Sequence, residues 1–343
     1  MWKHPILVLC AAMFTAAMTL HAEASIKFTV FDVPGALNTV PLSINAGGDI
    51  AGRYDKFDGT EGAFLRTADG TITTFNIPGG GTDPGEGTYA FSINDDGEIA
   101  GEYLDGEDDS HGYVRSPDGM FTIFTARGTD TFSGHIDAKG RVAGDYFDET
   151  RGVYRGFIRM PHGQIRAFDP PGGAAGMTGI RSEAISKGAV AGYFEDNSLV
   201  IHGYVRTAGG VFTPFDAPAA ASTYAEGINA SLETAGDYQT TDMTYHGFLR
   251  TSDGTFALFD GPDAANTFTG GLNDKGEVAG YYLDAANKAH GFLRRADGTI
   301  LPFDVPGFKK KNHDTTPHAI NVKGEITGGC FDGTNIHGFL REP

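Results

Sequence analysis

The fold is decided by a stretch that runs Ile93-Asn-Asp-Asp-Gly-Glu-Ile-Ala-Gly-Glu-Tyr103 and continues through His111-Gly-Tyr-Val-Arg115 to an apolar segment ending at Phe124. Its pattern recurs seven times in the 343-residue chain. The closing Phe of each unit follows the previous one after 44 to 49 residues, at Phe31, Phe75, Phe124, Phe168, Phe215, Phe259 and Phe303. This period is typical of a four-stranded propeller blade and is too long for most solenoid repeats.

Each unit contains four strand signals separated by turn residues. The first strand ends in a pair such as Ile93-Asn94, and the turn after it contains Gly97, which can supply a positive φ. The second strand carries a small pair such as Ala100-Gly101, which we expect to let neighbouring sheets approach one another. The third ends in an Arg, and the fourth contains Pro214 or Pro302 in two units. Because Pro removes a ladder donor, the fourth strand is expected at the outer edge of each blade and the first strand nearest the axis.

The two ends of the chain complement each other. The last unit stops after its third strand at Arg341, whereas residues 25–31 form a fourth strand that lacks the preceding three. Pairing of Ile26 to Phe31 with the third strand of the last unit would close the ring and remove the open sheet edges. The sequence therefore predicts an all-β fold with one domain, residues 25–343. This domain is expected to be a seven-bladed β-propeller of four-stranded antiparallel blades, closed by the N-terminal strand.

The first 24 residues differ in character from the rest of the chain. Lys3, the apolar run from Pro5 to Leu20, and Ala22-Glu23-Ala24 together match a secretory signal peptide with cleavage after Ala24. The apolar run is shorter than the roughly 20 residues that span a bilayer, and no later apolar segment is longer, so no membrane insertion is expected. We therefore expect an exported protein, periplasmic or extracellular. Only Cys330 remains after cleavage, and one cysteine cannot form an internal disulfide.

The charge of the chain narrows its range of partners. The net charge is −18, and it stays −18 when the first 24 residues take away Lys3 and Glu23. Such an acidic chain argues against nucleic acids and anionic membrane surfaces as partners. We expect a monomer whose partner is a small saccharide, a peptide or a protein.

The combined pattern of Ile-Asn-x-x-Gly, Ala-Gly-x-Tyr and His-Gly-Phe-Leu-Arg is most complete in the units that contain residues 246–250, 290–294 and 337–341. It resembles the HAF repeat of predicted bacterial extracellular proteins, over essentially the whole chain after residue 24. That family is named for His-Ala-Phe, whereas here Gly follows the His, and the one Ala-Phe pair, Ala63-Phe64, lacks the His. The resemblance implies a secreted bacterial repeat protein, and it implies no established activity or catalytic residue.

Five histidines begin the third strand of their units, at His111, His202, His246, His290 and His337. Ring symmetry would place them one to a blade and far apart, so they are not expected to share a metal ion. We interpret them, together with the seven repeated arginines, as structural residues that hydrogen-bond to a neighbouring strand or loop.

Functional residues are expected where the repeat is broken. If the fourth strand is outermost, the long connections between units all cross one face and end at the mouth of a central channel, and concave openings of this kind are the usual place for a ligand. The irregular residues at that point are the candidate ligand-binding set: Tyr89, His135, Arg181, Glu183, Tyr224, Glu226 and His318. The alternative is that these are solvated polar side chains that line the channel without a role.

Two further features could bind ions. The loop from Asp105 to Asp109, with Asp148, Asp196, Asp284 and Asp332 in the equivalent loops, could supply oxygen ligands for Ca²⁺, but no loop has an EF-hand or nonapeptide calcium pattern. The run Lys309-Lys310-Lys311 could capture an anion. Solvated turns and loops are the favoured interpretation of both features, and no cofactor is expected.

Two functions stay open at this point. The first is a binding or interaction module that holds a saccharide, peptide or protein at the channel mouth, favoured because the repeats are regular and no catalytic constellation stands out. The second is a carbohydrate-active lyase or hydrolase at the same mouth. In that case His135 or His318 would be the base, Tyr89 or Tyr224 the acid, and Arg181 would neutralise a substrate carboxylate. No catalytic residue is assigned.

Overall fold

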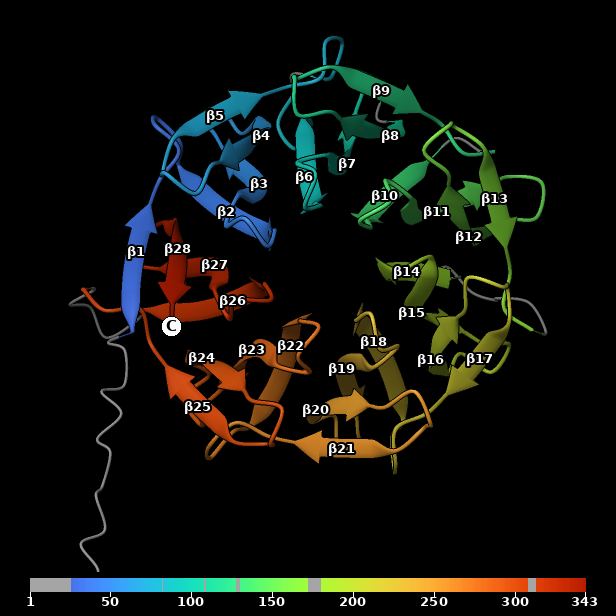
Figure 1. Ribbon diagram of the computed structural model, residues 1–343, viewed down its shortest axis with the longest axis vertical. Helices are drawn as coiled ribbons and strands as arrows, with labels where there is room; N and C mark the ends of the chain where they lie inside the picture. The colour runs from blue at the N-terminus through green and yellow to red at the C-terminus, as the bar shows by residue number, and fades with distance from the viewer. Residues whose placement is uncertain (1–25, 82, 108, 128–129, 172–179, 308–312) are drawn as a thin grey trace, which may run out of the picture.

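The computed structural model describes residues 26–81, 83–107, 109–127, 130–171, 180–307 and 313–343. Seven four-stranded sheets surround a common axis (Figure 1), which confirms the predicted seven-bladed propeller. The regular elements of these residues are all strands, and no helix that could cross a membrane is found among them. The expected signal peptide, residues 1–24, and the run 309–311 lie outside the described residues.

The strands of blades one to three follow one another from the axis outward, in chain order. Blade one contains β2 (Asn38–Ile44), β3 (Ile50–Asp55), β4 (Glu61–Arg66) and β5 (Ile72–Phe75). Blade two contains β6 (Thr88–Ile93), β7 (Ile99–Leu104), β8 (Ser110–Arg115) and β9 (Phe121–Phe124). Blade three contains β10 (Thr131–Ile136), β11 (Val142–Asp148), β12 (Val153–Arg159) and β13 (Ile165–Phe168).

The next three blades repeat this order, and the last blade combines the two ends of the chain. Blade four contains β14 (Ile180–Ser186), β15 (Ala189–Glu195), β16 (Ile201–Arg206) and β17 (Phe212–Phe215). Blade five contains β18 (Ser222–Ile228), β19 (Thr234–Gln239), β20 (Tyr245–Arg250) and β21 (Phe256–Phe259). Blade six contains β22 (Asn266–Leu272), β23 (Val278–Leu283), β24 (Ala289–Arg294) and β25 (Ile300–Phe303). Blade seven contains β26 (Asp314–Ile320), β27 (Ile326–Phe331), β28 (Ile336–Glu342) and β1 (Lys27–Phe31).

The ring is closed by the N-terminal strand, as predicted. β1 pairs antiparallel with β28, from Lys27 opposite Glu342 to Phe31 opposite Gly338, and the two strands lie side by side in Figure 1. The ring of Phe31 is buried and meets the ring of Phe64 in blade one at 6.2 Å, edge to face. The first and last strands of the described residues therefore share one sheet, and that sheet packs on blade one as any other blade would.

The small pair of the second strand makes room within its own blade. A Cβ atom at Gly101 would lie 1.9 Å from the carbonyl oxygen of Tyr89 on the inner strand of the same blade. Ala100, in contrast, is fully buried and packs with Ile136 and Val142 of the next blade. The expectation that both residues serve the contact between blades is thus correct for the Ala, while the Gly accommodates the inner strand.

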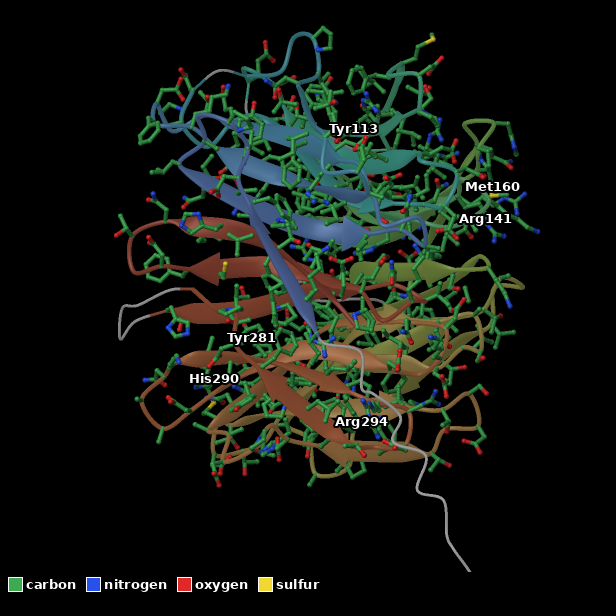
Figure 2. The ribbon with its side chains drawn as sticks, turned by 60° about the vertical axis from the view of Figure 1, so that its left-hand side comes forward. Tyr113, Arg141, Met160, Tyr281, His290 and Arg294 are labelled. Carbon is green, nitrogen blue, oxygen red and sulfur yellow. The ribbon has the colours of Figure 1, made fainter. Side chains whose placement is uncertain are left out.

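The seven repeated arginines link neighbouring blades. Each guanidinium lies over the closing Phe ring of the preceding blade, at 4.6 to 5.1 Å from the ring centre: Arg66 over Phe31, Arg115 over Phe75, Arg159 over Phe124, Arg206 over Phe168, Arg250 over Phe215, Arg294 over Phe259 and Arg341 over Phe303. Arg294 is labelled in Figure 2. Cation–π contacts of this kind are worth about 0.5–2 kcal/mol each. The structural interpretation of these arginines agrees with this geometry.

Candidate functional site

The inner strand of every blade contains a β-bulge. A bulge leaves a residue out of the ladder and changes the direction of its side chain. The residues left out are Leu42, Phe91, Gly134, Glu183 together with Ser182, Glu226, Gly270 and His318. Three of the seven predicted site residues therefore lie at a bulge, and a fourth, His135, follows one directly.

Blades two, three and four line a pocket of about 380 Å³, which we call the acidic pocket. Its lining residues are Phe91, Glu102, Phe132, Ser133, Gly134, His135, Asp145, Arg181, Ser182, Glu183 and Tyr193. All of them lie on strands, so the framework of the propeller fixes their positions and no loop is needed to form the site. Of the predicted residues, the pocket brings together His135, Arg181 and Glu183.

Arg181 joins blade four to blade three. Its Nη1 donates a hydrogen bond to the Asp145 carboxylate at 2.9 Å, and its guanidinium lies 4.7 Å from the centre of the Tyr154 ring. Burial raises the pKa of Asp145 to about 7, although the charge of Arg181 opposes this shift. Burial lowers the pKa of Arg181, but Asp145 and its other neighbours outweigh burial and raise it overall. The predicted anion-binding Arg is thus already paired with a carboxylate of this chain.

Two further carboxyl groups line the pocket. Burial, followed by the charge of Asp145, raises the pKa of Glu102 to about 8, and the backbone N–H of Ser133 is hydrogen-bonded to this carboxyl. Burial also raises the pKa of Glu183, while Arg181 and a hydrogen bond with Tyr193 act in the opposite direction. Near neutral pH Glu102 and Asp145 therefore take up and release protons, which ordinary surface carboxyls do not do, and the pKa of Glu183 is shifted in the same direction.

The pocket also contains uncharged polar groups. Burial lowers the pKa of His135 to about 4, so its imidazole is neutral at physiological pH. Ser133 is 1% exposed, and its hydroxyl has no hydrogen-bond partner within the described residues. A buried hydroxyl usually finds a partner, so this orphaned group on the pocket wall is notable.

A pair of carboxyl groups outside the acidic pocket, those of Asp237 and Glu226, lies at the junction of blades five and six. We call it the second carboxyl pair. Asp237 accepts a hydrogen bond from the backbone N–H of Thr269 at 2.7 Å, and the Thr269 hydroxyl is 3.5 Å from a carboxyl oxygen of Glu226. Burial raises the pKa of Asp237 to about 7. Burial and then the charge of Asp237 raise the pKa of Glu226 well above its usual range. The pair therefore retains a proton at a pH where isolated carboxyls have lost theirs.

The other three predicted residues are engaged in contacts within the framework of the propeller. The Tyr89 hydroxyl donates to the carbonyl oxygen of Gly85 at 2.9 Å. The ring of Tyr224 meets the ring of Tyr193 at 5.2 Å, edge to face. His318 is hydrogen-bonded through Nδ1 to the carbonyl oxygen of Pro41 at 2.7 Å, a contact that joins blade seven to blade one. None of the three lines the acidic pocket.

Sequence reasoning missed one whole series of residues, the position after Ala-Gly on the second strand. Its members are Arg53, Glu102, Asp145, Tyr193, Asp237, Tyr281 and Gly329. Three of them line the acidic pocket and a fourth belongs to the second carboxyl pair. The signal was available, because this position varies in charge and size from unit to unit while the residues before it repeat.

Each of the five repeated histidines contacts two side-chain oxygen atoms, one through each ring nitrogen. His290 contacts Asp304 through Nδ1 at 2.9 Å and Asp284 through Nε2 at 3.5 Å, and His337 contacts Asp32 in the same manner at 2.9 Å. In blade three Arg155 takes the place of the His and pairs with Asp169 and Asp148. These contacts fit the structural interpretation, because they connect the residue that follows the fourth strand of a blade to its third strand.

The candidate calcium loops use their carboxylates internally. Asp196 accepts hydrogen bonds from the backbone N–H groups of Ser198 and Val200, and Asp284 does the same for Ala286 and Lys288. Among the described residues, no group of three or more His, Cys, Asp or Glu side chains is placed to hold a metal ion. Asp108, in the loop with the most acidic residues, lies outside the described residues.

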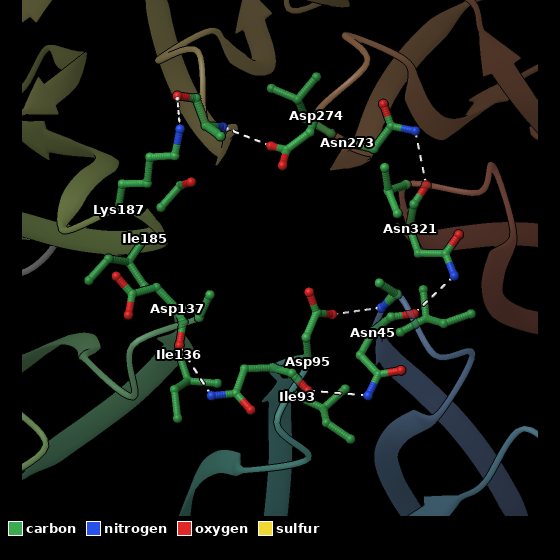
Figure 3. A pocket seen from close by; sticks show the side chains of 18 of the residues that line it. Asn45, Ile93, Asp95, Ile136, Asp137, Ile185, Lys187, Asn273, Asp274 and Asn321 are labelled. Atoms are coloured by element: carbon green, nitrogen blue, oxygen red, sulfur yellow. Dashed lines mark hydrogen bonds between the residues drawn. The ribbon is translucent and has the colours of Figure 1, made fainter.

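At the other end of the inner strands the turns surround a second pocket of about 540 Å³, which we call the turn-side pocket (Figure 3). Asn side chains there donate to the backbone carbonyl of the next blade: Asn45 to Asn94, Asn94 to Asp137, Asn229 to Asn273, Asn273 to Asn321 and Asn321 to Asn45. The relay is interrupted at two blades. In blade three Asp137 takes the place of the Asn and accepts the backbone N–H of Gly188 at 3.0 Å. In blade four the turn is one residue shorter, and Lys187 donates to the carbonyl of Ala230 at 3.2 Å. The polar groups of this pocket are thus largely engaged in holding the ring together.

Comparisons with known proteins agree with the fold. No protein-family model matches the chain, and no curated protein matches it in sequence. Among solved structures, a streptogramin B lyase is similar with a TM-score of 0.59 and 15% identity, over 93% of this chain and 98% of the lyase. The β-propeller domain of the Trilobed protease from Pyrococcus furiosus gives 0.60 and 11% identity, over 90% and 95%. The BP39L lectin from Burkholderia pseudomallei gives 0.52 and 9%, over 79% and 86%. At these identities the similarity establishes the β-propeller fold alone.

Proposed function

We propose that this chain is an exported binding propeller of the HAF-repeat type that holds a saccharide in the acidic pocket. Export is supported by the signal-like composition of residues 1–24. The placement of the ligand is supported by the pocket, which is the place where three of the irregular residues meet.

One observation carries the choice of a saccharide. The acidic pocket combines three aromatic rings, from Phe91, Phe132 and Tyr193, with carboxyl, guanidinium and hydroxyl groups on the same wall. A sugar ring presents an apolar C–H face and a rim of hydroxyl groups, so it needs a ring surface and several hydrogen-bonding groups side by side. The volume of the acidic pocket, about 380 Å³, lies at the lower end of the usual range for small-molecule sites. A lectin is among the propellers with this architecture.

The test is a ligand screen on the chain from residue 25 onward. Neutral mono- and oligosaccharides are added in a thermal-shift assay, and hits are measured by calorimetry. A ligand at a hundred times its Kd stabilises a protein by about 2.7 kcal/mol, which corresponds to roughly 4 °C for a chain of this size. A screen in which short peptides shift the melting temperature and saccharides do not would contradict the proposal.

A matched pair of variants locates the site. Tyr193→Phe and Tyr281→Phe each remove one hydroxyl at the same position of the repeat, but only Tyr193 lines the acidic pocket. We expect Tyr193→Phe to weaken saccharide binding and Tyr281→Phe to leave it unchanged. Equal effects of the two substitutions would place the ligand elsewhere.

A second candidate function is catalysis in the same pocket. The carboxyls of Glu102 and Asp145, with pKa values raised by burial to about 8 and about 7, are suited to general acid–base work near neutral pH. A streptogramin B lyase has the same overall fold. In this case Glu102→Gln would abolish turnover of a saccharide while leaving its binding within a few-fold of wild type. Binding without turnover by the wild-type chain would favour the first function.

A further inference from the structure

The junction between blades three and four contains a small pocket of about 80 Å³, which we call the arginine pocket. Its lining residues are Arg141, Ile158, Met160, Arg166, Gly188, Arg206 and Ala208. Figure 2 labels two of them, Arg141 and Met160. The lining contains three arginines and no Asp or Glu, although the chain as a whole has a net charge of −18. It shares Arg141 with the turn-side pocket and no residue with the acidic pocket.

Arg141 occupies a position that carries a Glu in four other blades. The side chains of those glutamates lie against the turn glycine of the next blade: Glu98 near Gly140, Glu233 near Gly276, Glu277 near Gly324 and Glu325 near Gly48. Arg141 lies against Gly188 of blade four in the same way, and a Cβ atom at Gly188 would overlap its Nη1 atom. The junction of blades three and four therefore has a positive charge where four other junctions have a negative one.

Arg206 is the repeated arginine of blade four, and it lacks the carboxylates that its counterparts have. Burial lowers the pKa of three counterparts, and a Glu of the preceding blade opposes burial in each case: Glu98 for Arg159, Glu233 for Arg294 and Glu277 for Arg341. Burial lowers the pKa of Arg206 as well, Tyr204 opposes this shift, and the charge of Arg166 adds to it. The turn after the third strand also differs, because blade four has Gly209 where four other blades have Asp69, Asp118, Asp253 and Asp297.

The contacts of the three guanidinium groups leave two of them with neutral partners. Arg141 donates a hydrogen bond from Nε to the Asp137 carboxylate at 2.8 Å. Arg166 donates to the amide oxygen of Gln164, at 3.3 Å from Nε and 3.1 Å from Nη2. The Nη1 of Arg206 donates to a backbone carbonyl oxygen at 3.4 Å. Two positive charges of the pocket therefore lack an anionic partner among the described residues.

Two such charges beside a third guanidinium favour a ligand with two negative charges. A phosphate group has a charge of about −1.5 to −2 at pH 7, and the planar fork of Arg matches its geometry. Ile158, Met160 and Ala208 form the apolar part of the lining, and charges interact more strongly where water is excluded. The volume of about 80 Å³ is far below the roughly 300–1,000 Å³ of sites that hold a whole small molecule, so the pocket suits a single oxyanion group.

We propose that the arginine pocket binds a tetrahedral oxyanion with two negative charges, a phosphate or sulfate group held by Arg141, Arg166 and Arg206. The net charge of the chain repels anions at long range, so the affinity depends on these contacts and not on a general attraction. The group is either an inorganic ion or the end of a larger ligand, since both present the same oxygen atoms. This site goes beyond the saccharide function and does not depend on it.

The test is a calorimetric titration of the chain from residue 25 onward, near neutral pH and at constant ionic strength. The titrants are inorganic phosphate, inorganic sulfate and glycerol 3-phosphate, and we expect saturable binding. Tighter binding of glycerol 3-phosphate than of inorganic phosphate would identify an ester as the ligand, and the reverse order would identify the free ion. Absence of binding for all three titrants would overturn the proposal.

A matched pair of variants locates the anion. Arg166→Gln removes an exposed guanidinium from the pocket and should raise the Kd for phosphate by about 10- to 100-fold, the effect of one charge-assisted hydrogen bond. Arg295→Gln removes the same charge from an exposed residue near Arg341, where Glu277 supplies a carboxylate, and should leave the Kd unchanged. Equal effects of the two substitutions would contradict the assignment of the site.

Gly209→Asp tests the site without removing an arginine. It gives blade four the Asp of four other blades, where Thr67 donates to Asp69 at 2.6 Å, and a Cβ atom at Gly209 meets only the Thr207 hydroxyl, at 3.8 Å. We expect a Tm equal to or above that of wild type and a loss of phosphate binding, because the new carboxylate takes the place of the anion. Gly209→Asn has the same size without the charge and should retain binding. A folded Gly209→Asp chain that binds phosphate as tightly as wild type would overturn the proposal.

Discussion

The strand that closes the ring can be removed without altering any other part of the chain. We consider a chain that starts at residue 34 and therefore lacks β1 and the two residues after it. The deletion removes the buried side chains of Phe31 and Val33, which are 9% and 1% exposed. It also removes the ring that lies under Arg66 at 4.8 Å and the carboxylate that contacts His337. The edge of β28 is left without its partner strand.

The size of the effect follows from these contacts. Full burial of Phe31 and Val33 is worth about 1.5–3 kcal/mol each, or about 5 kcal/mol together. The cation–π contact adds about 1 kcal/mol. For 318 residues, from 26 to 343, the unfolding entropy near the melting temperature is about 0.7 kcal/mol per kelvin, so a loss of about 6 kcal/mol lowers Tm by roughly 9 °C.

Differential scanning calorimetry of the two chains measures this shift. A synthetic peptide of residues 25–33, added in excess, should restore part of the lost Tm, because it can pair with the open edge of β28. A scrambled peptide of the same composition should not. A truncated chain that melts at the temperature of the longer one would refute the view that β1 stabilises the ring.

Three further predictions concern other parts of the molecule. Arg294→Met should lower the stability by about 1–2 kcal/mol through loss of its contact with the Phe259 ring, whereas Arg295→Met on the exposed surface should have little effect; chemical denaturation measures both. Burial raises the pKa of Glu102 to about 8 in the folded state, so folding favours its protonated form and stability should fall as pH rises from about 4 through 8. Glu102→Gln should reduce that fall, as denaturation at pH 5 and pH 8 would reveal, and an unchanged slope would contradict the shift. Burial lowers the pKa of His202, but Asp216 and Asp196 outweigh it and raise the value overall. The resulting stabilisation should be complete below about pH 6.5 and disappear as pH rises through the folded-state pKa, and His202→Gln should remove this dependence from the melting curves.

The closure of the ring could be predicted because strand signals are a local property of the sequence. A unit that ends at Arg341 without a fourth strand, and a fourth strand that ends at Phe31 without the other three, can be counted along the chain. The same holds for the outer position of the fourth strand, because Pro214 and Pro302 can lie only where the ladder donor is not needed. Periodicity therefore determines the architecture.

The acidic pocket could be predicted only in part, since a repeat pattern does not tell which way a side chain points. The bulges reorient residues such as Glu183 and Glu226, and they are not visible as a gap or an insertion in the sequence. The residues after Ala-Gly, among them Glu102 and Asp145, meet the inner strand of the next blade, as the contact of Asp145 with Arg181 illustrates. The contact between these residues and the inner strand of the next blade depends on the angle between the two blades, which the sequence of a single unit does not specify.

The pairing of β1 with β28 has one more consequence, for the position of the chain ends. Arg341 pairs with Phe28 as Arg115 pairs with Phe121 in blade two. Five residues, 116–120, separate the latter two, and a peptide bond from Pro343 to Ser25 would also leave five residues between Arg341 and Phe28. β28 and β1 thus lack only the turn that joins the third and fourth strands in each of the other blades. A backbone cyclised at this point, with Asp-Gly in place of Ser25-Ile26, could then be reopened at the corresponding turn of any other blade.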